Sequence, residues 1–194
     1  MAEWVSPTAS AGPQVVLHVG CGPRQFDTLH ARFRGPAWRE VRLDIDQRVQ
    51  PDVVASITDM PMVGSASVDA VWSSHNLEHL HAFEVPQALA EFLRVLKPGG
   101  CALIAVPDLQ RAAELVAAEQ AEAAAYVSPA GPITPLDMIF GHRVQTQSNP
   151  FMAHRTGFTA RTLIQALAQA GFRRVQLERH EFELLAEASK GTPP

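Results

Sequence analysis

The stretch Val15-Val16-Leu17-His18-Val19-Gly20-Cys21-Gly22-Pro23 carries the strongest fold signal in this chain. A short apolar run rich in β-branched residues leads directly into a Gly-x-Gly turn, which predicts a buried strand followed by a ligand-binding loop. Glycine suits such a loop because it permits a tight reversal and lets a ligand approach the backbone closely. By itself the turn is a weak signal, so its meaning depends on the motifs that come after it along the chain.

Strand-like and helix-like segments alternate after this turn. Further strands are expected at 40–45, 52–55, 68–72 and 101–106, and helices at 25–33 and 86–96. The helix at 86–96 has an apolar stripe, and Lys97-Pro98-Gly99-Gly100 ends it. Strands that alternate with helices predict an α/β fold with a parallel sheet.

The C-terminal half differs in composition and in its hydrophobic pattern. Residues 108–126 are rich in Ala and Glu and predict a helix, whereas 128–156 are apolar but aperiodic and interrupted by Pro and Gly. A helix at 159–170 and a strand at 172–182 follow. Since a long apolar segment without a period usually covers something, we expect an insertion or lid at about 108–156.

Length and charge limit the classes of protein to consider. The 194 residues suit one domain, which we place at 14–194 after a flexible leader at 1–13 that lacks the features of a signal peptide. A net charge of −4 argues against a nucleic-acid partner, and no apolar run reaches the ~18 residues of a membrane span. The only two cysteines, Cys21 and Cys101, lie in apolar strand-like segments, so we expect a reducing cytoplasm. Both a monomer and a homodimer remain open.

Polar residues follow several of the predicted strands. Ligands of open α/β sheets bind beyond the carboxyl ends of the strands. Those ends read Gly20-Cys21-Gly22, Asp44-Ile45-Asp46, Ser73-Ser74-His75 and Pro107-Asp108. Asp44 lies some twenty residues after the glycine turn, where a carboxylate can accept hydrogen bonds from both ribose hydroxyls. The alternative is a carboxylate that merely caps a turn.

An ordered set of motifs makes the chain resemble the class I S-adenosylmethionine-dependent methyltransferases, in particular small bacterial proteins with a type 11 or 12 methyltransferase domain. The motifs lie at 17–22, 42–46, 57–61, 67–72, 76–80, 93–100 and 157–172. The resemblance implies a Rossmann-like fold, with a mostly parallel seven-stranded sheet, helices on both faces and an antiparallel C-terminal strand. It also implies S-adenosyl-L-methionine as cofactor.

The resemblance assigns contacts to that cofactor. It places Asp59 at the adenine amino group and the backbone amide of Met60 at the adenine ring. Gly20, Cys21, Gly22, Asp44 and Ser74 are the other expected contacts. The first motif departs from the family by having His18 where an acidic residue is usual and Pro23-Arg24 where a third glycine often stands. Arg24 is therefore a candidate for the methionine carboxylate, the alternative being an ordinary surface charge.

Histidines are the candidate catalytic residues. His75 is the proposed base, because its strand end adjoins the methyl group in this architecture, and its alternative is a capping or packing role. His142 and His154, in the insertion, are candidate acceptor contacts, and His79 is interpreted as structural. The segment His75-Asn76-Leu77-Glu78-His79 also matches a zinc-peptidase pattern. Because methyltransferase motifs surround this segment, we expect that it does not bind a metal.

The function expected from these features is direct, in-line methyl transfer to an unidentified acceptor, a small molecule or sugar-like precursor. One alternative is a non-catalytic, methyltransferase-like partner subunit. The other is an NAD-dependent oxidoreductase, which fits less well because Gln25 stands where Gly-x-Gly-x-x-Gly needs its third glycine.

Overall fold

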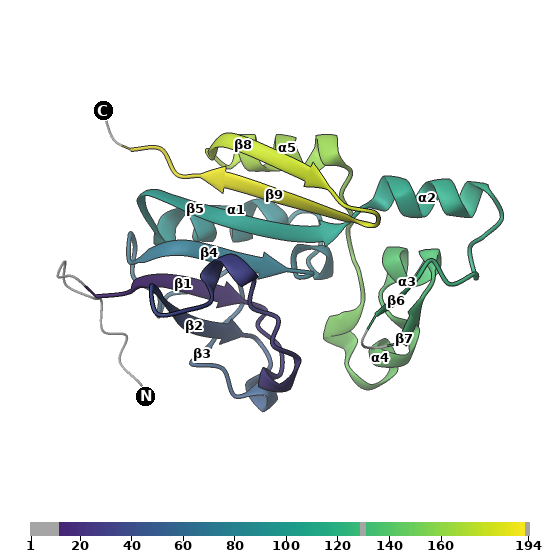
Figure 1. Ribbon diagram of the computed structural model, residues 1–194, viewed down its shortest axis with the longest axis horizontal. Coiled ribbons are helices and arrows are strands. Elements are labelled where there is room, and N and C mark those ends of the chain that lie inside the picture. Colours follow the sequence, from purple (N-terminus) through teal and green to yellow (C-terminus); the bar gives the residue numbers. More distant parts are fainter. Residues whose placement is uncertain (1–11, 129–130, 193–194) are drawn as a thin grey trace.

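A seven-stranded sheet forms the centre of the molecule in a computed structural model that describes residues 12–128 and 131–192 (Figure 1). Its order is β3-β2-β1-β4-β5-β9-β8. The bounds are β1 (Gln14–Val19), β2 (Trp38–Asp44), β3 (Val53–Val54), β4 (Val68–Ser74), β5 (Leu96–Pro107), β8 (Arg173–Arg179) and β9 (Glu183–Ser189). The first five strands are parallel, and β9 runs antiparallel to both of its neighbours. This topology confirms the predicted mostly parallel sheet with an antiparallel C-terminal strand.

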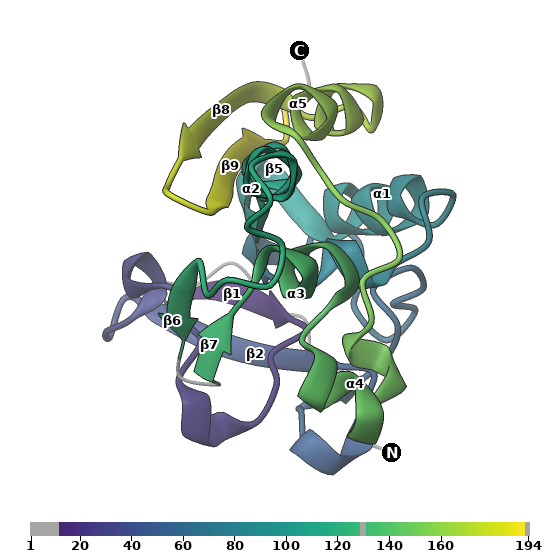
Figure 2. The same cartoon turned by 90° about the vertical axis from the view of Figure 1, so that its right-hand side faces the viewer.

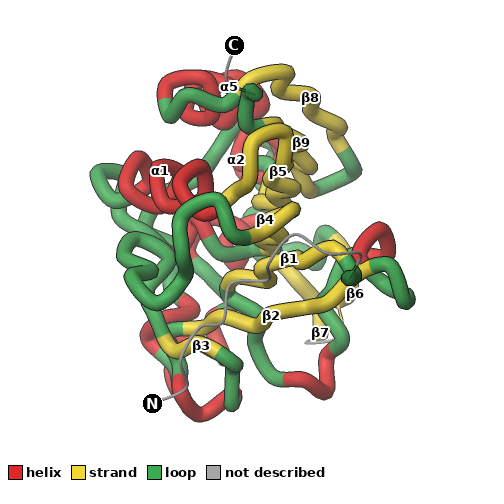
Figure 3. Tube along the Cα trace, turned by 90° about the vertical axis from the view of Figure 1, so that its left-hand side faces the viewer, coloured by secondary structure: helices red, strands yellow, loops and turns green. Residues whose placement is uncertain are grey.

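One face of the sheet is covered by two α-helices, α1 (Val85–Val95) and α5 (Ala160–Gln169), which lie on the same side in Figure 3. Phe92 of α1 and Leu163 of α5 are completely buried in the same core as the β1 residues Leu17 and Val19. A capping box at Thr159 begins α5. Both helices form close to where the sequence predicts them.

The opposite face carries no α-helix within the described residues, and the helix predicted at 25–33 is wrong. Two short 3-10 helices, η1 (Arg24–Phe26) and η2 (Ala31–Phe33), stand in its place. Asp27 ends the first of them with a left-handed φ of 42°. Phe33 still packs against the sheet, but Phe26 points to solvent, so the apolar spacing that predicted a helix does not belong to one face.

The insertion lies beyond the carboxyl ends of the parallel strands (Figures 1 and 2). The predicted helix at 108–126 is shorter than expected, since α2 spans only Leu109–Ala117. The rest contains the hairpin β6 (Tyr126–Ser128) and β7 (Gly131–Ile133), the helices α3 (Pro135–Phe140) and α4 (Arg143–Ser148), and the 3-10 helix η5 (Pro150–Met152). The segment predicted to be irregular is therefore a series of short elements that faces the edge of the sheet.

The expected leader at 1–13 falls almost wholly outside the described residues, which begin at residue 12. No helix in the described ranges combines the length and apolar content that crossing a membrane requires.

Candidate functional site

The glycine turn after β1 adopts the backbone that its sequence predicts. Gly20 and Gly22 have φ values of +59° and +60°, a region that disfavours side chains. A Cβ on Gly20 would stand 2.6 Å from Cγ of Asn76, whereas a Cβ on Gly22 would meet nothing within 4 Å. Gly20 therefore allows Asn76 to lie directly against the turn, and Gly22 leaves open space.

Asn76 was not singled out by the sequence. Its Nδ2 is buried and has no hydrogen-bond partner among the described residues, so a donor stands ready beside the glycine turn. Nothing in its local sequence indicates that position, because Asn76 follows β4 and meets the turn only through strand pairing.

Asp44 ends β2 beside the same turn, as predicted. One carboxylate oxygen accepts the amide of Gly22 at 2.9 Å, and the other accepts the amide of Asp46 at 2.9 Å. The turn-capping role is therefore present. Each carboxylate oxygen can accept a second hydrogen bond, so a ribose contact remains compatible with it.

Buried polar side chains of β1 and β2 lie next to the turn. His18 is 1% exposed, and its Nδ1 lies 2.6 Å from Oε1 of Glu40 in β2. Burial lowers the pKa of His18, although Glu40 opposes the shift. Arg42, also buried, donates to the carbonyl of Gly22. The sequence missed Glu40 and Arg42, since alternating charges in a strand normally indicate a solvent-facing side.

The backbone of Met60, an expected adenine contact, is hydrogen-bonded within the protein. Its amide donates to Oε2 of Glu91 at 2.7 Å, and its carbonyl accepts from Arg94 at 2.9 Å. Arg94 also holds Glu91 in place. The amide of Met60 therefore has a partner inside the protein, which does not favour the expected adenine contact, whereas Asp59 beside it is exposed.

Three other expected cofactor contacts have distinct surroundings. The side chain of Arg24 is 61% exposed and lies 3.4 Å from Asp52, which matches a surface charge pair. Cys21 is fully buried, and burial raises its pKa to about 11, so the thiol is protonated. Ser74 is half-buried at the end of β4.

His75 follows β4 directly, and both of its ring nitrogens lie near carboxylates. Its Nε2 lies 3.0 Å from Oε2 of Glu183, and its Nδ1 lies 3.4 Å from Oε1 of Glu78. Burial would lower the pKa of His75, but the two carboxylates outweigh it and raise the pKa to about 10. Both ring nitrogens thus lie near carboxylates, an arrangement that favours the packing role, and the catalytic base stays a prediction.

A cavity of about 240 Å³ separates the sheet edge from the insertion. Glu78 and Pro107 line it from the sheet side, and Met138, Phe140 and His154 line it from the insertion. Glu78 belongs to the 3-10 helix η4 (Leu77–His79), which follows β4 directly. The cavity therefore combines an apolar wall with a buried carboxylate and an imidazole.

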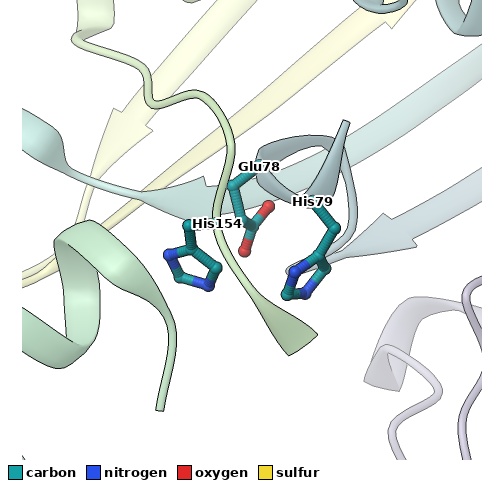
Figure 4. Close-up of side chains that lie close together, drawn as sticks. All are labelled: Glu78, His79 and His154. Atoms are coloured by element: carbon teal, nitrogen blue, oxygen red, sulfur yellow. The ribbon is translucent and has the colours of Figure 1, made fainter. Parts of the chain in front are cut away.

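The structure separates the two histidines predicted in the insertion. His142 caps α4, where its ring accepts the amide of Gln145 at 3.4 Å. His154 lines the cavity, and its ring lies against that of His79 with centroids 4.9 Å apart (Figure 4). His154 thus lies at the cavity, whereas His142 lies at the start of α4.

Comparisons with known proteins agree with this architecture. The methyltransferase domain family matches residues 17–104. A dimethylglycine N-methyltransferase from Parasynechococcus marenigrum (strain WH8102) is 39% identical over 72 residues, which are 36% of this chain and 25% of that protein. The matched region therefore spans about a quarter of the length of this curated relative.

Solved methyltransferases share the fold across nearly the whole chain. An S-adenosylmethionine-dependent methyltransferase from Methanosarcina mazei matches with a TM-score of 0.61 and 15% identity over 95% of both chains. The 1,6-didemethyltoxoflavin-N1-methyltransferase from Burkholderia thailandensis, solved with its substrate and S-adenosylhomocysteine, matches with a TM-score of 0.55 and 20% identity over 93% of this chain and 72% of its own. Identities this low establish the fold alone. Together with the methyltransferase domain matched at residues 17–104, they show that the chain has the fold of the class I S-adenosylmethionine-dependent methyltransferases.

Proposed function

We propose that this protein transfers a methyl group from S-adenosyl-L-methionine to a small-molecule acceptor held in the cavity beneath the insertion. One observation carries the proposal. The glycine turn after β1 and the cavity at Glu78 both lie at the carboxyl edge of the sheet, and Asn76, two residues before Glu78, contacts the turn. A cofactor seated on the turn would therefore face the cavity.

The residues at the turn fit the proposed cofactor. Gly22 leaves room for a ligand, Asp44 keeps lone pairs for ribose hydroxyls, and the unpartnered Nδ2 of Asn76 offers a buried donor. The other proposed contacts are Cys21, Ser74, Arg24 and the exposed Asp59. Met60 is not among them, because its amide is engaged inside the protein.

The chain's own contribution to the reaction would be positioning. When bound, the cofactor supplies an electrophilic methyl group on a cationic sulfur. The protein must hold the acceptor in line with it and keep water out. The insertion serves both needs, since Met138 and Phe140 wall the cavity and His154 offers a polar contact to the acceptor.

Two relatives support a small acceptor. The curated relative is a dimethylglycine N-methyltransferase, and the Burkholderia enzyme holds 1,6-didemethyltoxoflavin. A 240 Å³ cavity suits ligands of that general size better than a polymer. We further propose that the protein resides in the bacterial cytoplasm. The two free cysteines support this compartment.

Calorimetric titration tests the cofactor half of the proposal. The protein should bind S-adenosyl-L-methionine, and Asp44→Asn should weaken binding by roughly 5- to 150-fold, because about 1–3 kcal/mol of charge-assisted hydrogen bonding is lost. Asp27→Asn, which alters an exposed carboxylate in an ion pair with Arg34, is the matched control and should change nothing. Binding of NAD without binding of S-adenosyl-L-methionine would overturn the proposal.

Isotope transfer tests the acceptor half. Incubation of the protein with metabolite extract and methyl-labelled cofactor should produce a labelled small molecule that mass spectrometry identifies. If the cofactor binds but no metabolite acquires the label, the non-catalytic partner subunit becomes the better interpretation.

A further inference from the structure

The carboxylate of Glu78 is buried in an unusual state. The residue is 1% exposed, and neither carboxylate oxygen has a hydrogen-bond partner among the described residues. Nδ1 of His75 lies 3.4 Å from Oε1, which is an ion-pair distance without hydrogen-bond geometry. A buried carboxylate is costly unless something coordinates it, so these oxygens call for a further partner.

Two imidazoles approach that carboxylate with defined tautomers. Nδ1 of His79 lies 3.2 Å from the carbonyl of Ala153, and Nδ1 of His154 lies 2.8 Å from the carbonyl of Met138. A carbonyl can only accept, so each Nδ1 carries a proton, and in the neutral imidazole Nε2 keeps its lone pair. Metal-binding histidines are typically oriented by this kind of backbone hydrogen bond.

We propose that Glu78, His79 and His154 bind one divalent transition-metal ion of the Zn²⁺ and Fe²⁺ class. Each of the three offers a ligand atom, and these atoms all lie within 4.8 Å of one another (Figure 4). Two imidazoles and one carboxylate form the ligand set of open zinc and non-haem iron sites. The proposal replaces the expectation of no metal.

The ligand set differs from the zinc-peptidase interpretation of the same sequence. That pattern would use His75 and His79 as ligands with Glu78 as base. In the structure His75 turns toward Glu183, and His154, 75 residues after His79 along the chain, takes its place. No local motif indicates this pairing.

The position of the site suggests what the ion does. Backbone amides of Arg155 and Thr156 donate to the carbonyl of Glu78 at 2.8 and 3.2 Å, so the insertion is already tied to η4 at this point. An ion held by His154 and by Glu78 would strengthen that tie. Both residues line the cavity, which leaves its remaining coordination positions facing the acceptor. That last role rests on the proposed function.

Metal titration without cofactor tests the site directly. After chelator treatment, Co²⁺ should give visible d–d absorption that saturates at one ion per chain, and Zn²⁺ should displace it. His79→Asn and His154→Asn should each weaken binding at least tenfold, because asparagine can keep the donor near Nδ1 but removes Nε2. The control is His180→Asn, whose side chain is 53% exposed in the loop between β8 and β9, and it should bind like the parent.

Further readouts separate the outcomes. Zn²⁺ should raise the thermal midpoint of the parent but not of His154→Asn, while affinity for S-adenosyl-L-methionine should be the same in both, so failure here is distinct from failure of the proposed function. Comparison of the metal-free midpoints reveals any variant that fails to fold. Absence of saturable Co²⁺ absorption, or binding that persists in both histidine variants, would overturn the proposal. Turnover that depends on His154 but is unaffected by chelation would also overturn it.

Discussion

Gly20 and Gly22 show how two identical residues, two positions apart, can be required for different reasons. Both have φ values near +60°, but only Gly20 lies against a side chain, that of Asn76. The sequence predicts the special backbone at both positions. It does not predict the contact, which depends on β4 lying next to β1.

This difference leads to a matched pair of substitutions. Gly22→Ala should cost about 1–2 kcal/mol of unfolding free energy, because alanine is strained in the left-handed region. Gly20→Ala should cost at least ~1 kcal/mol more, because its Cβ also collides with Asn76. Urea unfolding measures both. Equal losses would show that Asn76 moves aside freely.

His18 is the residue at which this chain departs most clearly from the usual first motif. Its ring is buried against Glu40, and burial lowers its pKa below the ordinary value of 6.5. A neutral histidine can occupy this position at neutral pH, whereas the unfolded chain takes up a proton as the pH falls.

The pH dependence of stability is a consequence of that shift. Since the pKa is lower in the folded state, the contribution of His18 is complete above pH 6.5 and is lost as the pH falls from 6.5 toward the lowered value. Urea unfolding at pH 7.5 and 5.5 should therefore show a larger loss for the parent than for His18→Asn. His180→Asn, with its exposed ring, should behave like the parent. Identical losses in all three proteins would mean that His18 titrates normally.

At the level of elements, helices with their own capping signals were predicted well and those without were not. The helix α5 begins at a capping box, and α1 has a proline in its first turn and a buried stripe. The segment 25–33 has suitable spacing of Phe26 and Phe33 but no side-chain cap at its start, and the carbonyl of Thr28 accepts a hydrogen bond from Nε1 of Trp72. A tertiary hydrogen bond competes there with helical pairing.

The insertion is organised around the short helix α3. Its capping box joins Thr134 to Asp137, whose carboxylate also accepts the amide of Arg143 at 3.1 Å. Burial would raise the pKa of Asp137, but these donors hold it at about 2. The cap is therefore ionised at any ordinary pH and fixes the wall of the cavity.

Removal of that carboxylate should loosen the cavity wall and leave the cofactor site alone. In Asp137→Ala, amides of residues 135–141 should exchange hydrogen roughly 2- to 30-fold faster, which corresponds to the ~0.5–2 kcal/mol of a lost cap. Binding of S-adenosyl-L-methionine should be unchanged. Glu122→Gln is the control, because Glu122 pairs with the same Arg143 but is mostly exposed. Equal exchange in both variants would contradict this role for Asp137.

For the whole molecule, local patterns were sufficient to predict the class of sheet and its parallel core. Strands, glycine turns and helix ends are each determined by neighbouring residues. Parallel strands always bring their carboxyl ends to the same edge of the sheet. The position of Asp44 beside the glycine turn is therefore predictable from the sequence alone, and its carboxylate does accept the amide of Gly22.

Three features could not be read from the chain. They are the occupied amide of Met60, the carboxylates beside His75 and the meeting of Glu78 with His154. Each depends on groups far away in sequence: Glu91 lies 31 residues from Met60, and Glu183 lies 108 from His75. The protonation and availability of a buried group depend on the groups that pack against it. Those partners meet only when α1, β9 and the insertion assemble on the parallel strands. The glycine turn thus predicts where the cofactor would bind, and the folded insertion forms the cavity proposed for the acceptor.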